Sequence, residues 1–310
     1  MTPLVSVLIT AFNRETLIAA AIESVLTQTF SDFEIIVSDN QSTDGTVDIA
    51  RQFERRDSRV RVHVNDRNIG QFGNRNRAAS LASGRFLKFH DSDDLMYPHC
   101  LSVMVPPMEA EPRAGFGLSN SRNWPGGPVP MLLNPHESYQ REFLGFGLFM
   151  CGPGGAIFRT DVFRELGGFV DYGAPSDTIF WIRACARYPV MLLPGDLFYY
   201  REHSGQIFQE AGVARQYASV PRHLWEALSS SECPLDDEER DLARRNVAFS
   251  VAKAAWHAAR RGDWSLAAHR LSASGIGAGE WTRYLRRPRR STAAGIGRPA
   301  GSRPQTKSPA

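Results

Sequence analysis

Residues 84–94 read Gly84-Arg85-Phe86-Leu87-Lys88-Phe89-His90-Asp91-Ser92-Asp93-Asp94, a mostly apolar stretch of strand length that ends in three carboxylates. Like charges this close repel one another and favour a cation between them. Hard divalent cations such as Mg²⁺ and Mn²⁺ prefer carboxylate oxygens and commonly bridge to substrate phosphates. The stretch therefore predicts a strand that leads into a metal and diphosphate site. A solvated turn in which Asp93 or Asp94 caps the next helix is the alternative.

The chain before this stretch alternates between strand and helix patterns. Continuous apolar runs indicate strands buried on both faces, as in a parallel sheet. The expected strands are 4–12, 33–38 and 60–64, and the expected helices follow them at 17–26, 47–53 and 74–83. This order is typical of a doubly wound α/β sheet, in which ligands bind at the carboxyl ends of the strands. Asp39 and Asp91 both follow strands, so we expect them to face one ligand.

The second half of the chain is less regular. Residues 112–155, which include Trp124, contain many Gly and Pro residues, and we expect loops plus an edge strand there. Three helices are expected at 208–230, 236–261 and 264–273, with Trp256, Trp264 and Leu271 buried in the last helical hairpin. The sequence thus predicts three parts, which are an α/β domain at 1–207, a helical region at 208–285 and a tail at 286–310.

Composition excludes some classes of protein. The 310 residues are 42% hydrophobic and 22% charged, as in ordinary globular proteins. Residues 286–310 carry seven basic side chains and no acid, and the rest of the chain has 29 basic against 33 acidic residues. The body is therefore not a basic nucleic-acid binder. The tail, rich in Gly, Pro, Ser and Arg, is expected to be disordered, and either solvated or in contact with an anionic membrane.

Cysteine spacing and hydropathy point to the cytoplasm. The four cysteines are widely spaced, so neither a zinc site nor a disulfide framework is predicted. Met1-Thr2-Pro3 lacks the basic leader of a signal peptide. The longest lipid-like stretch, Phe143 to Phe158, contains Pro153 and is too short to cross a bilayer. We expect a cytoplasmic protein with at most peripheral contact at the inner face of the membrane.

Seven motifs, in order over about residues 4–205, together resemble a family-2 glycosyltransferase with the GT-A fold. They are Val5 to Arg14, Phe33 to Thr46, Asn68-x-Gly70 with Arg75-Asn76, the D-x-D motif Asp91-Ser92-Asp93, Gly155 to Phe169, Asp177 with Trp181 and Arg183, and Tyr200-Arg201-Glu202-His203. The resemblance implies a doubly wound mixed sheet with a C-terminal helical appendage. Two departures from the family pattern are Asn40-Gln41, where Asp-Gly is usual, and Ser176, where Glu is usual.

The resemblance also implies a nucleotide site. In it, Asp39 would accept hydrogen bonds from a pyrimidine base edge such as uracil, although an Asp here can also cap a helix. Asn68 and Gly70 would hold base and ribose, or be simple turn residues. The implied nucleotide-binding set is Thr10, Ala11, Phe12, Asn13, Arg14, Asp39, Asn68, Gly70, Arg75, Asn76, Asp91 and Ser92.

The implied cofactor is Mn²⁺ or Mg²⁺, which would neutralise the leaving diphosphate. Asp93 is the expected direct metal ligand. His203 would be a second ligand or a phosphate contact, although a loop histidine is also ordinary polar surface.

Asp177 is the expected catalytic base, because an acceptor hydroxyl must lose its proton as it attacks the anomeric carbon. The alternative is that Asp177 only caps the helix that holds Trp181. A direct displacement with one base inverts the anomeric configuration. Gly154, Gly155 and Trp181 are assigned to the acceptor or sugar side, although packing and orientation are the favoured roles for Trp181 and Arg183.

The predicted function is an inverting, metal-dependent glycosyltransferase that uses a UDP-sugar or dTDP-sugar. Its acceptor would be a hydroxyl of a polysaccharide, a lipid-linked glycan, a peptide or a small natural product. A nucleotide-sugar-binding protein without transferase activity remains an alternative. A nucleotidyltransferase is a weaker one, because residues 11–14 form no Gly-rich basic phosphate loop. A nicotinamide dehydrogenase would need G-x-G-x-x-G after the first strand, which is missing.

Overall fold

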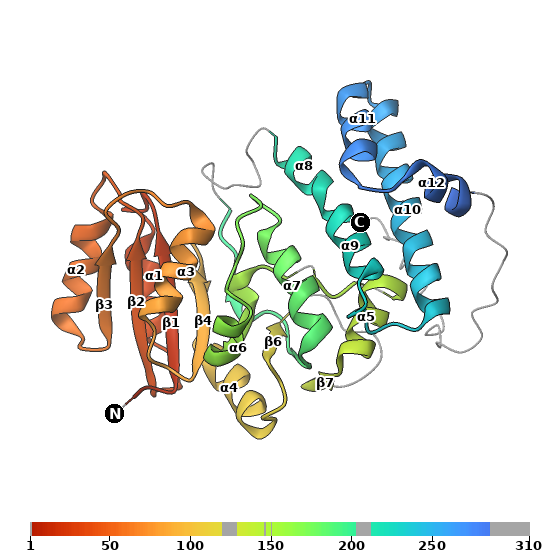
Figure 1. Cartoon of the computed structure of the whole chain (residues 1–310). Helices are drawn as coiled ribbons and strands as arrows, with labels where there is room; N and C mark the ends of the chain where they lie inside the picture. The colour runs from red at the N-terminus through yellow and green to blue at the C-terminus, as the bar shows by residue number, and fades with distance from the viewer. Residues whose placement is uncertain (1, 120–128, 146, 150, 203–211, 286–310) are drawn as a thin grey trace, which may run out of the picture.

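A computed structural model describes residues 2–119, 129–145, 147–149, 151–202 and 212–285. Among them, eight strands form one mixed sheet in the order β3-β2-β1-β4-β8-β6-β9-β7 (Figure 1). These strands are β1 (Val5–Ala11), β2 (Phe33–Asp39), β3 (Val60–Val64), β4 (Phe86–Asp91), β6 (Phe116–Ser119), β7 (Met131–Leu133), β8 (Ala156–Arg159) and β9 (Val190–Leu193). A second, two-stranded sheet pairs β5 (Leu95–Met96) with β10 (Phe198–Tyr199).

Helices cover both faces of the large sheet and continue beyond its β7 edge (Figure 1). They are α1 (Ile18–Leu26), α2 (Thr46–Arg56), α3 (Gln71–Leu81), α4 (Cys100–Ala110), α5 (Pro135–Leu144), α6 (Thr160–Glu165), α7 (Ser176–Arg187), α8 (Val213–Gln216), α9 (Val220–Ser229), α10 (Asp237–Arg260), α11 (Trp264–Ala273) and α12 (Ala278–Leu285). Two 3₁₀ turns, η1 (Pro153–Gly155) and η3 (Tyr217–Ser219), matter for the site.

The first half of the chain confirms the predicted α/β class. Strands β1, β2 and β4 are parallel, as expected from their uninterrupted apolar runs, and nearly every residue in them is buried. In their register, Ala11 lies opposite Asp39 and Thr10 lies opposite Asp91. The carboxyl ends of these three strands therefore meet at one edge of the sheet, which brings the predicted site residues together.

Strand β8 reverses the direction of the sheet beside β4. It runs antiparallel to β4, with Lys88 opposite Ile157 and Phe86 opposite Arg159. The start of β8, and the 3₁₀ turn η1 before it, thus lie at the edge where β4 ends.

Residues 112–155 contain more regular structure than the sequence predicted. Strand β7 is at the sheet edge, but β6 lies inside the sheet between β8 and β9, and 135–144 form α5. The signal for α5 is a capping box, in which Asn134 accepts from the Glu137 N–H at 3.0 Å and Glu137 accepts from the Asn134 N–H at 2.8 Å. The many Gly and Pro residues around it conceal this signal. Trp124 lies outside the described residues.

The C-terminal helices share a core with the sheet domain. Tyr139 and Trp181 belong to the same buried apolar cluster as Trp225 and Val247. The core thus continues across the predicted boundary at 207/208, and the division into domains stays a prediction. The tail 286–310 lies outside the described residues.

The expected burial of Trp256, Trp264 and Leu271 is wrong. These side chains are 53%, 72% and 43% exposed. The α10–α11 hairpin instead closes on Ala255, Ala258, Leu266 and Ala267. Because these contacts are mostly alanines, the two helices approach closely, and the indoles point outward.

Two further observations concern membrane-spanning helices and the cysteines. No helix within the described ranges combines the length and apolar character that crossing a membrane requires. The four cysteines are buried and unbridged.

Candidate functional site

The loops that follow β1 and β2 are bound to each other. The Asn13 N–H donates to Ser42 Oγ at 2.8 Å, and the Thr43 N–H donates to Asn13 Oδ1 at 2.8 Å. Glu15 Oε2 accepts from the Gly45 N–H at 2.8 Å. Asn13 has a φ of 52°, in the left-handed region that Asn tolerates better than most residues. These contacts fix residues 10–14 beside the end of β2.

Asp39 is buried, and its carboxylate is engaged by its own loop. Its Oδ1 accepts from the Ser42 N–H at 2.8 Å, and its Oδ2 accepts from the Ser42 hydroxyl at 2.5 Å. A base bound here would share Asp39 with Ser42 or displace the hydroxyl. The role of Asp39 in base recognition stays a prediction.

Asn40 is a residue whose role sequence reasoning missed. Its Nδ2 donates to Asn68 Oδ1 at 2.8 Å and to the Gly70 carbonyl at 3.3 Å, and its Oδ1 accepts from the Ile69 N–H at 2.9 Å. Asp, the usual residue in the family, has no amide to donate. The replacement of the usual Asp by Asn40 was the feature of the sequence that could have indicated this role. The Asn40 side chain holds residues 68–70 against β2.

Each carboxylate of the D-x-D motif lies against an arginine. Arg75 Nη2 donates to Asp91 Oδ1 at 2.6 Å, and Arg14 Nε donates to Asp93 Oδ2 at 3.2 Å. Arg75 comes from α3 and its side chain is only 3% exposed, whereas Asp91 and Asp93 are 31% and 18% exposed. The two acidic side chains therefore reach solvent at the edge of the sheet, and the buried guanidinium of Arg75 lies behind Asp91.

Asp94 lies beneath the D-x-D motif. It is buried and accepts from the Arg201 N–H at 3.0 Å. Burial, and then the charge of Asp91, raise the pKa of Asp94 to about 7. The pKa of Tyr200 is also raised, by burial and by the nearby aspartates. Residues 200–201 thus lie against the acidic cluster, and His203, the predicted second metal ligand, lies outside the described residues.

The donor set fits a hard divalent cation in its chemistry. Asp91 and Asp93 offer partly exposed carboxylate oxygens, which Mg²⁺ and Mn²⁺ prefer as ligands. Within the described ranges, no three His, Cys, Asp or Glu side chains are grouped so that they could hold a metal ion. The metal-binding roles of Asp93 and His203 stay predictions. Ser92 is buried between the two carboxylates.

Asp177 lies at the start of α7, and its Oδ1 accepts from the Thr178 N–H at 2.6 Å. Burial raises the pKa of Asp177 to about 6, and the charge of Arg75 opposes this rise. Burial, and then the charge of Asp177, raise the pKa of Tyr217 to about 12, so η3 reaches this carboxylate. Ser176, at the usual Glu position, closes the preceding turn by donating to the Gly173 carbonyl at 2.6 Å.

The residues assigned to the acceptor side are more buried than expected. Gly154 and Gly155 are buried in η1, and Lys88 Nζ donates to the Gly154 carbonyl. Trp181 is fully buried, and its Nε1 donates to the Cys151 carbonyl at 2.7 Å. Its ring stacks on Phe158 in the core. Trp181 is therefore a packing residue in this structure and has no surface to offer a sugar.

Asn76 has a clear structural contact. Its Nδ2 donates to the Phe169 carbonyl at 2.7 Å, and its Oδ1 accepts from the Phe169 N–H at 2.9 Å. It holds the segment before Asp177 against α3. Contact between Asn76 and a nucleotide stays a prediction.

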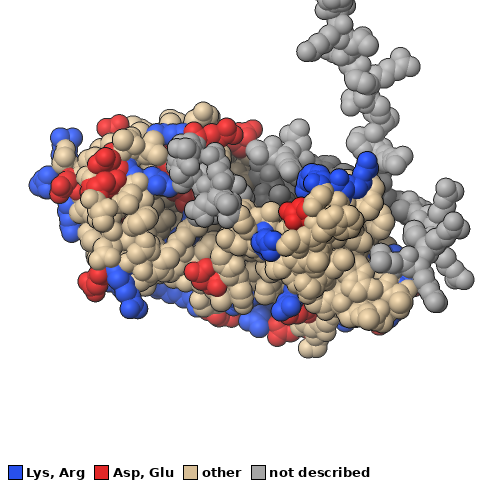
Figure 2. Space-filling view, turned by 90° about the horizontal axis from the view of Figure 1, so that it is seen from above, with Lys and Arg blue, Asp and Glu red and all other residues tan. Residues whose placement is uncertain are grey.

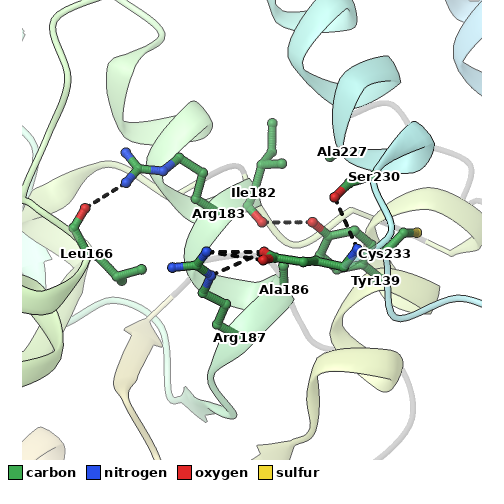
Figure 3. A pocket seen from close by; sticks show the side chains of 10 residues that line it. Tyr139, Leu166, Ile182, Arg183, Ala186, Arg187, Ala227, Ser230 and Cys233 are labelled. Carbon is green, nitrogen blue, oxygen red and sulfur yellow. Dashed lines mark hydrogen bonds and ion pairs between the residues drawn. The ribbon is translucent and has the colours of Figure 1, made fainter.

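A crevice between α5, α7 and α9 lies away from these carboxylates (Figure 3). It is lined by Tyr139, Ile182 and Cys233, and an ion pair of Arg187 with Glu232 at 3.2 Å spans it. None of the predicted catalytic, metal-binding or nucleotide-binding residues lines this crevice. Ile182 and Arg183, which follow Trp181 on α7, do line it. The candidate site is therefore assigned to the strand ends and not to the crevice.

Comparison with known proteins identifies the family. The model of the family described as "Glycosyl transferase family 2" matches residues 6–167, which is more than half of the chain. The match contains the loops after β1 and β2, the D-x-D motif and η1.

Curated relatives cover part of the chain. A GalNAc(5)-diNAcBac-PP-undecaprenol beta-1,3-glucosyltransferase from Campylobacter jejuni is 38% identical over 147 residues, which are 47% of this chain and 44% of the relative. The UDP-Glc:alpha-D-GlcNAc-diphosphoundecaprenol beta-1,3-glucosyltransferase WfaP from Escherichia coli is 40% identical over 117 residues, which are 38% and 45% of the two chains. The chain thus spans less than half the length of these relatives.

Solved structures support the fold. TarS 1-349 from S. aureus, in complex with UDP-GlcNAc, has a TM-score of 0.63 at 21% identity, covering 91% of this chain and 79% of that one. The mannosyltransferase PcManGT from Pyrobaculum calidifontis, in complex with GDP-Man and Mn²⁺, has a TM-score of 0.57 at 17% identity, covering 88% and 86%. Together with the family match and the GT-A-like sheet, these findings show that the chain belongs to glycosyl transferase family 2.

Proposed function

We propose that the protein transfers a sugar from a UDP-sugar to a hydroxyl of a lipid-linked glycan, with inversion and with the help of a divalent metal. The observation that carries this proposal is the meeting of Asp39, Asp91, Asp93 and the positive Arg75 at the carboxyl ends of adjacent parallel strands. Open α/β sheets bind their ligands at this position.

The choice of donor and acceptor is supported by the relatives. Two of them are named as glucosyltransferases with undecaprenol-linked acceptors, and a structural neighbour was solved with UDP-GlcNAc. UDP-glucose and UDP-GlcNAc are therefore the first donors to test, with a dTDP-sugar as the alternative.

The chain's own groups would handle the charge of the donor. Arg14 and Arg75 lie beside the D-x-D carboxylates, so a diphosphate there meets positive charge directly. Asp91 and Asp93 would hold a divalent cation, which supplies further positive charge to the diphosphate leaving group.

Asp177 would act as the base. In the reaction, the acceptor oxygen forms a bond to the anomeric carbon, the bond from that carbon to the diphosphate oxygen breaks, and the acceptor proton passes to Asp177. With a pKa of about 6, Asp177 is ionised at neutral pH yet still basic enough to take a proton. Attack on the face opposite the leaving group gives inversion.

A donor and acceptor screen tests the proposal. Release of UDP would be followed from UDP-glucose, UDP-GlcNAc, UDP-galactose and a dTDP-sugar with Mn²⁺, with and without a polyprenyl-diphosphate-linked N-acetylhexosamine. We expect one donor to be consumed in an acceptor-dependent way, and proton NMR of the product to show the opposite anomeric configuration. UDP binding without consumption of any donor would favour the binding-protein alternative, and retention of configuration would exclude the single displacement.

A further inference from the structure

The outer face of α10 carries large apolar side chains in water. Phe249 is 66% exposed and Trp256 is 53% exposed, and Trp264 at the start of α11 is 72% exposed. Exposed side chains of this size usually mark an interaction surface when they lie close to one another on one face. The helical repeat shows whether the exposed side chains of α10 lie on one face.

An α-helix turns by 100° per residue, and the exposed residues of α10 fall on one side. Leu242, Phe249, Lys253, Trp256 and Arg260 follow one another at spacings of 7, 4, 3 and 4. The opposite side is buried against the body of the protein and α11, through Ala243, Val247, Ala248, Val251, Ala255 and Ala258. The helix is therefore amphipathic in an unusual way, because its outer stripe alternates aromatic and basic residues. We call Phe249, Lys253, Trp256 and Arg260 the aromatic–basic stripe, and Trp264 is exposed four residues after its end, at the start of α11.

The two charged side chains of the stripe, Lys253 and Arg260, are both positive, and the nearest acid after them in sequence is Asp263, the N-cap of α11. Residues 242–262 contain five Lys or Arg and no Asp or Glu. The Arg260 guanidinium lies 4.8 Å from the centre of the Trp256 ring. Seen from above, the end of the molecule where the C-terminal helices lie shows mostly Lys and Arg among its charged side chains (Figure 2). The tail that follows α12 adds seven more basic residues and no acid.

We propose that the aromatic–basic stripe docks the protein on an anionic lipid surface. Trp and Phe partition into the headgroup region of a bilayer, and Lys and Arg beside them pair with anionic headgroups. The occupant is a membrane rather than a second copy of the chain, because the positive charges of Lys253 and Arg260 complement anionic headgroups, whereas a contact of one such stripe with another would set positive charge against positive charge. The inference concerns a surface outside the transfer site, and it does not require that the transfer reaction is as proposed.

Strands β1 and β2 and the helix α10 all end at the upper side of the molecule in Figure 1. The strand ends that carry the candidate site and the C-terminal end of α10 therefore lie toward the same side.

The test is sedimentation of the full-length protein with vesicles. We expect binding to vesicles of phosphatidylcholine mixed with phosphatidylglycerol, little binding to phosphatidylcholine alone, and loss of binding as salt is raised. Lys253→Glu with Arg260→Glu should weaken binding by at least about fivefold for each residue changed. The matched control is Arg55→Glu with Arg56→Glu, two exposed arginines on α2 at the other end of the molecule.

A second variant isolates the aromatic contribution. Trp256→Ser with Trp264→Ser should also weaken binding, and tryptophan fluorescence of the wild type should be quenched by brominated lipid much more than that of the variant. UDP affinity, measured on every variant, should stay unchanged and so separates this proposal from the proposed reaction. Vesicle binding that is equal in all variants would assign it to the tail and overturn the proposal. Absence of binding, or a dimer that only the stripe variants dissolve, would overturn it too.

Discussion

Arg75 donates from Nη2 to Oδ1 of Asp91 at 2.6 Å, and its charge, after the hydrogen bond from the Thr178 N–H, also opposes the burial that raises the pKa of Asp177. One buried cation thus acts on both a D-x-D carboxylate and the proposed base. Removing the charge of Arg75 should therefore affect both the D-x-D motif and the proposed base.

Replacement of Arg75 by Met should move the pH dependence of turnover. Without the nearby positive charge, the pKa of Asp177 rises further, so the ionisation seen in kcat shifts to higher pH. The measurement is a pH–rate profile of Arg75→Met beside Arg77→Met, an exposed arginine on the same helix. A profile that moves equally in both variants would show that Arg75 has no special relation to Asp177.

Replacement of Asp177 by Asn should separate binding from chemistry. UDP affinity and thermal stability should stay close to those of the wild type, while kcat falls by about 10² to 10⁴, the usual contribution of a positioned base. Because the pKa of Asp177 is raised to about 6, wild-type kcat should increase as the pH rises through about 6 and then level off. Asp171→Asn, an exposed carboxylate nearby in sequence, is the control. Near-normal turnover in Asp177→Asn would place the base elsewhere, with Asp171 and Glu202 next to test.

Metal dependence can be tested by calorimetry of UDP binding. Wild-type protein should bind UDP more tightly with Mn²⁺ than with a chelator, since the acidic cluster needs positive charge to accept a diphosphate. Asp93→Asn should lower the affinity measured with Mn²⁺ to the level measured without it, whereas Asp66→Asn, an exposed carboxylate outside the cluster, should not. Equal wild-type affinity in both conditions would remove the metal from the mechanism.

Restoring the usual family residues at Asn40 and Gln41 should have different effects on the free energy of unfolding. Asn40→Asp removes the donor to Asn68 and Gly70 in a buried place, so it should lower the free energy of unfolding by about 1–3 kcal/mol. Gln41 has a φ of 67°, so Gln41→Gly should leave stability unchanged or raise it by up to about 1 kcal/mol. Urea unfolding measures both. A neutral Asn40→Asp would mean that residues 68–70 are held by other contacts.

Sequence reasoning worked best where the signal was local. The apolar runs of β1, β2 and β4 located the strands, and their ends placed Asp39 and Asp91 at one edge. The family resemblance then assigned roles that spacing alone could not. The structure brings these residues together at the carboxyl ends of the strands.

The structure differs from the sequence predictions where contacts between residues far apart in the sequence decide the outcome. The pattern of α10 and α11 predicted helices correctly, but no pattern shows whether a Trp has a partner, and Trp256 and Trp264 have none large enough to bury them. The motif placed Trp181 on the sugar side with packing as its favoured role, and packing on Phe158 buries it. The role of Asn40 depends on side chains some thirty residues away, and no local rule could supply that contact.

The reversed direction of β8 sets the distance between the D-x-D motif and η1. Because β8 begins at the edge where β4 ends, the strand that bears Asp91 at its tip also supports η1 through Lys88, three residues earlier. Those three residues span about 10 Å of extended chain. The separation of the D-x-D motif from η1 is thus governed by the covalent repeat of one strand rather than by a hinge between domains. Inserting a single residue between Lys88 and Asp91 would turn one of them to the other face and uncouple the two halves of the site.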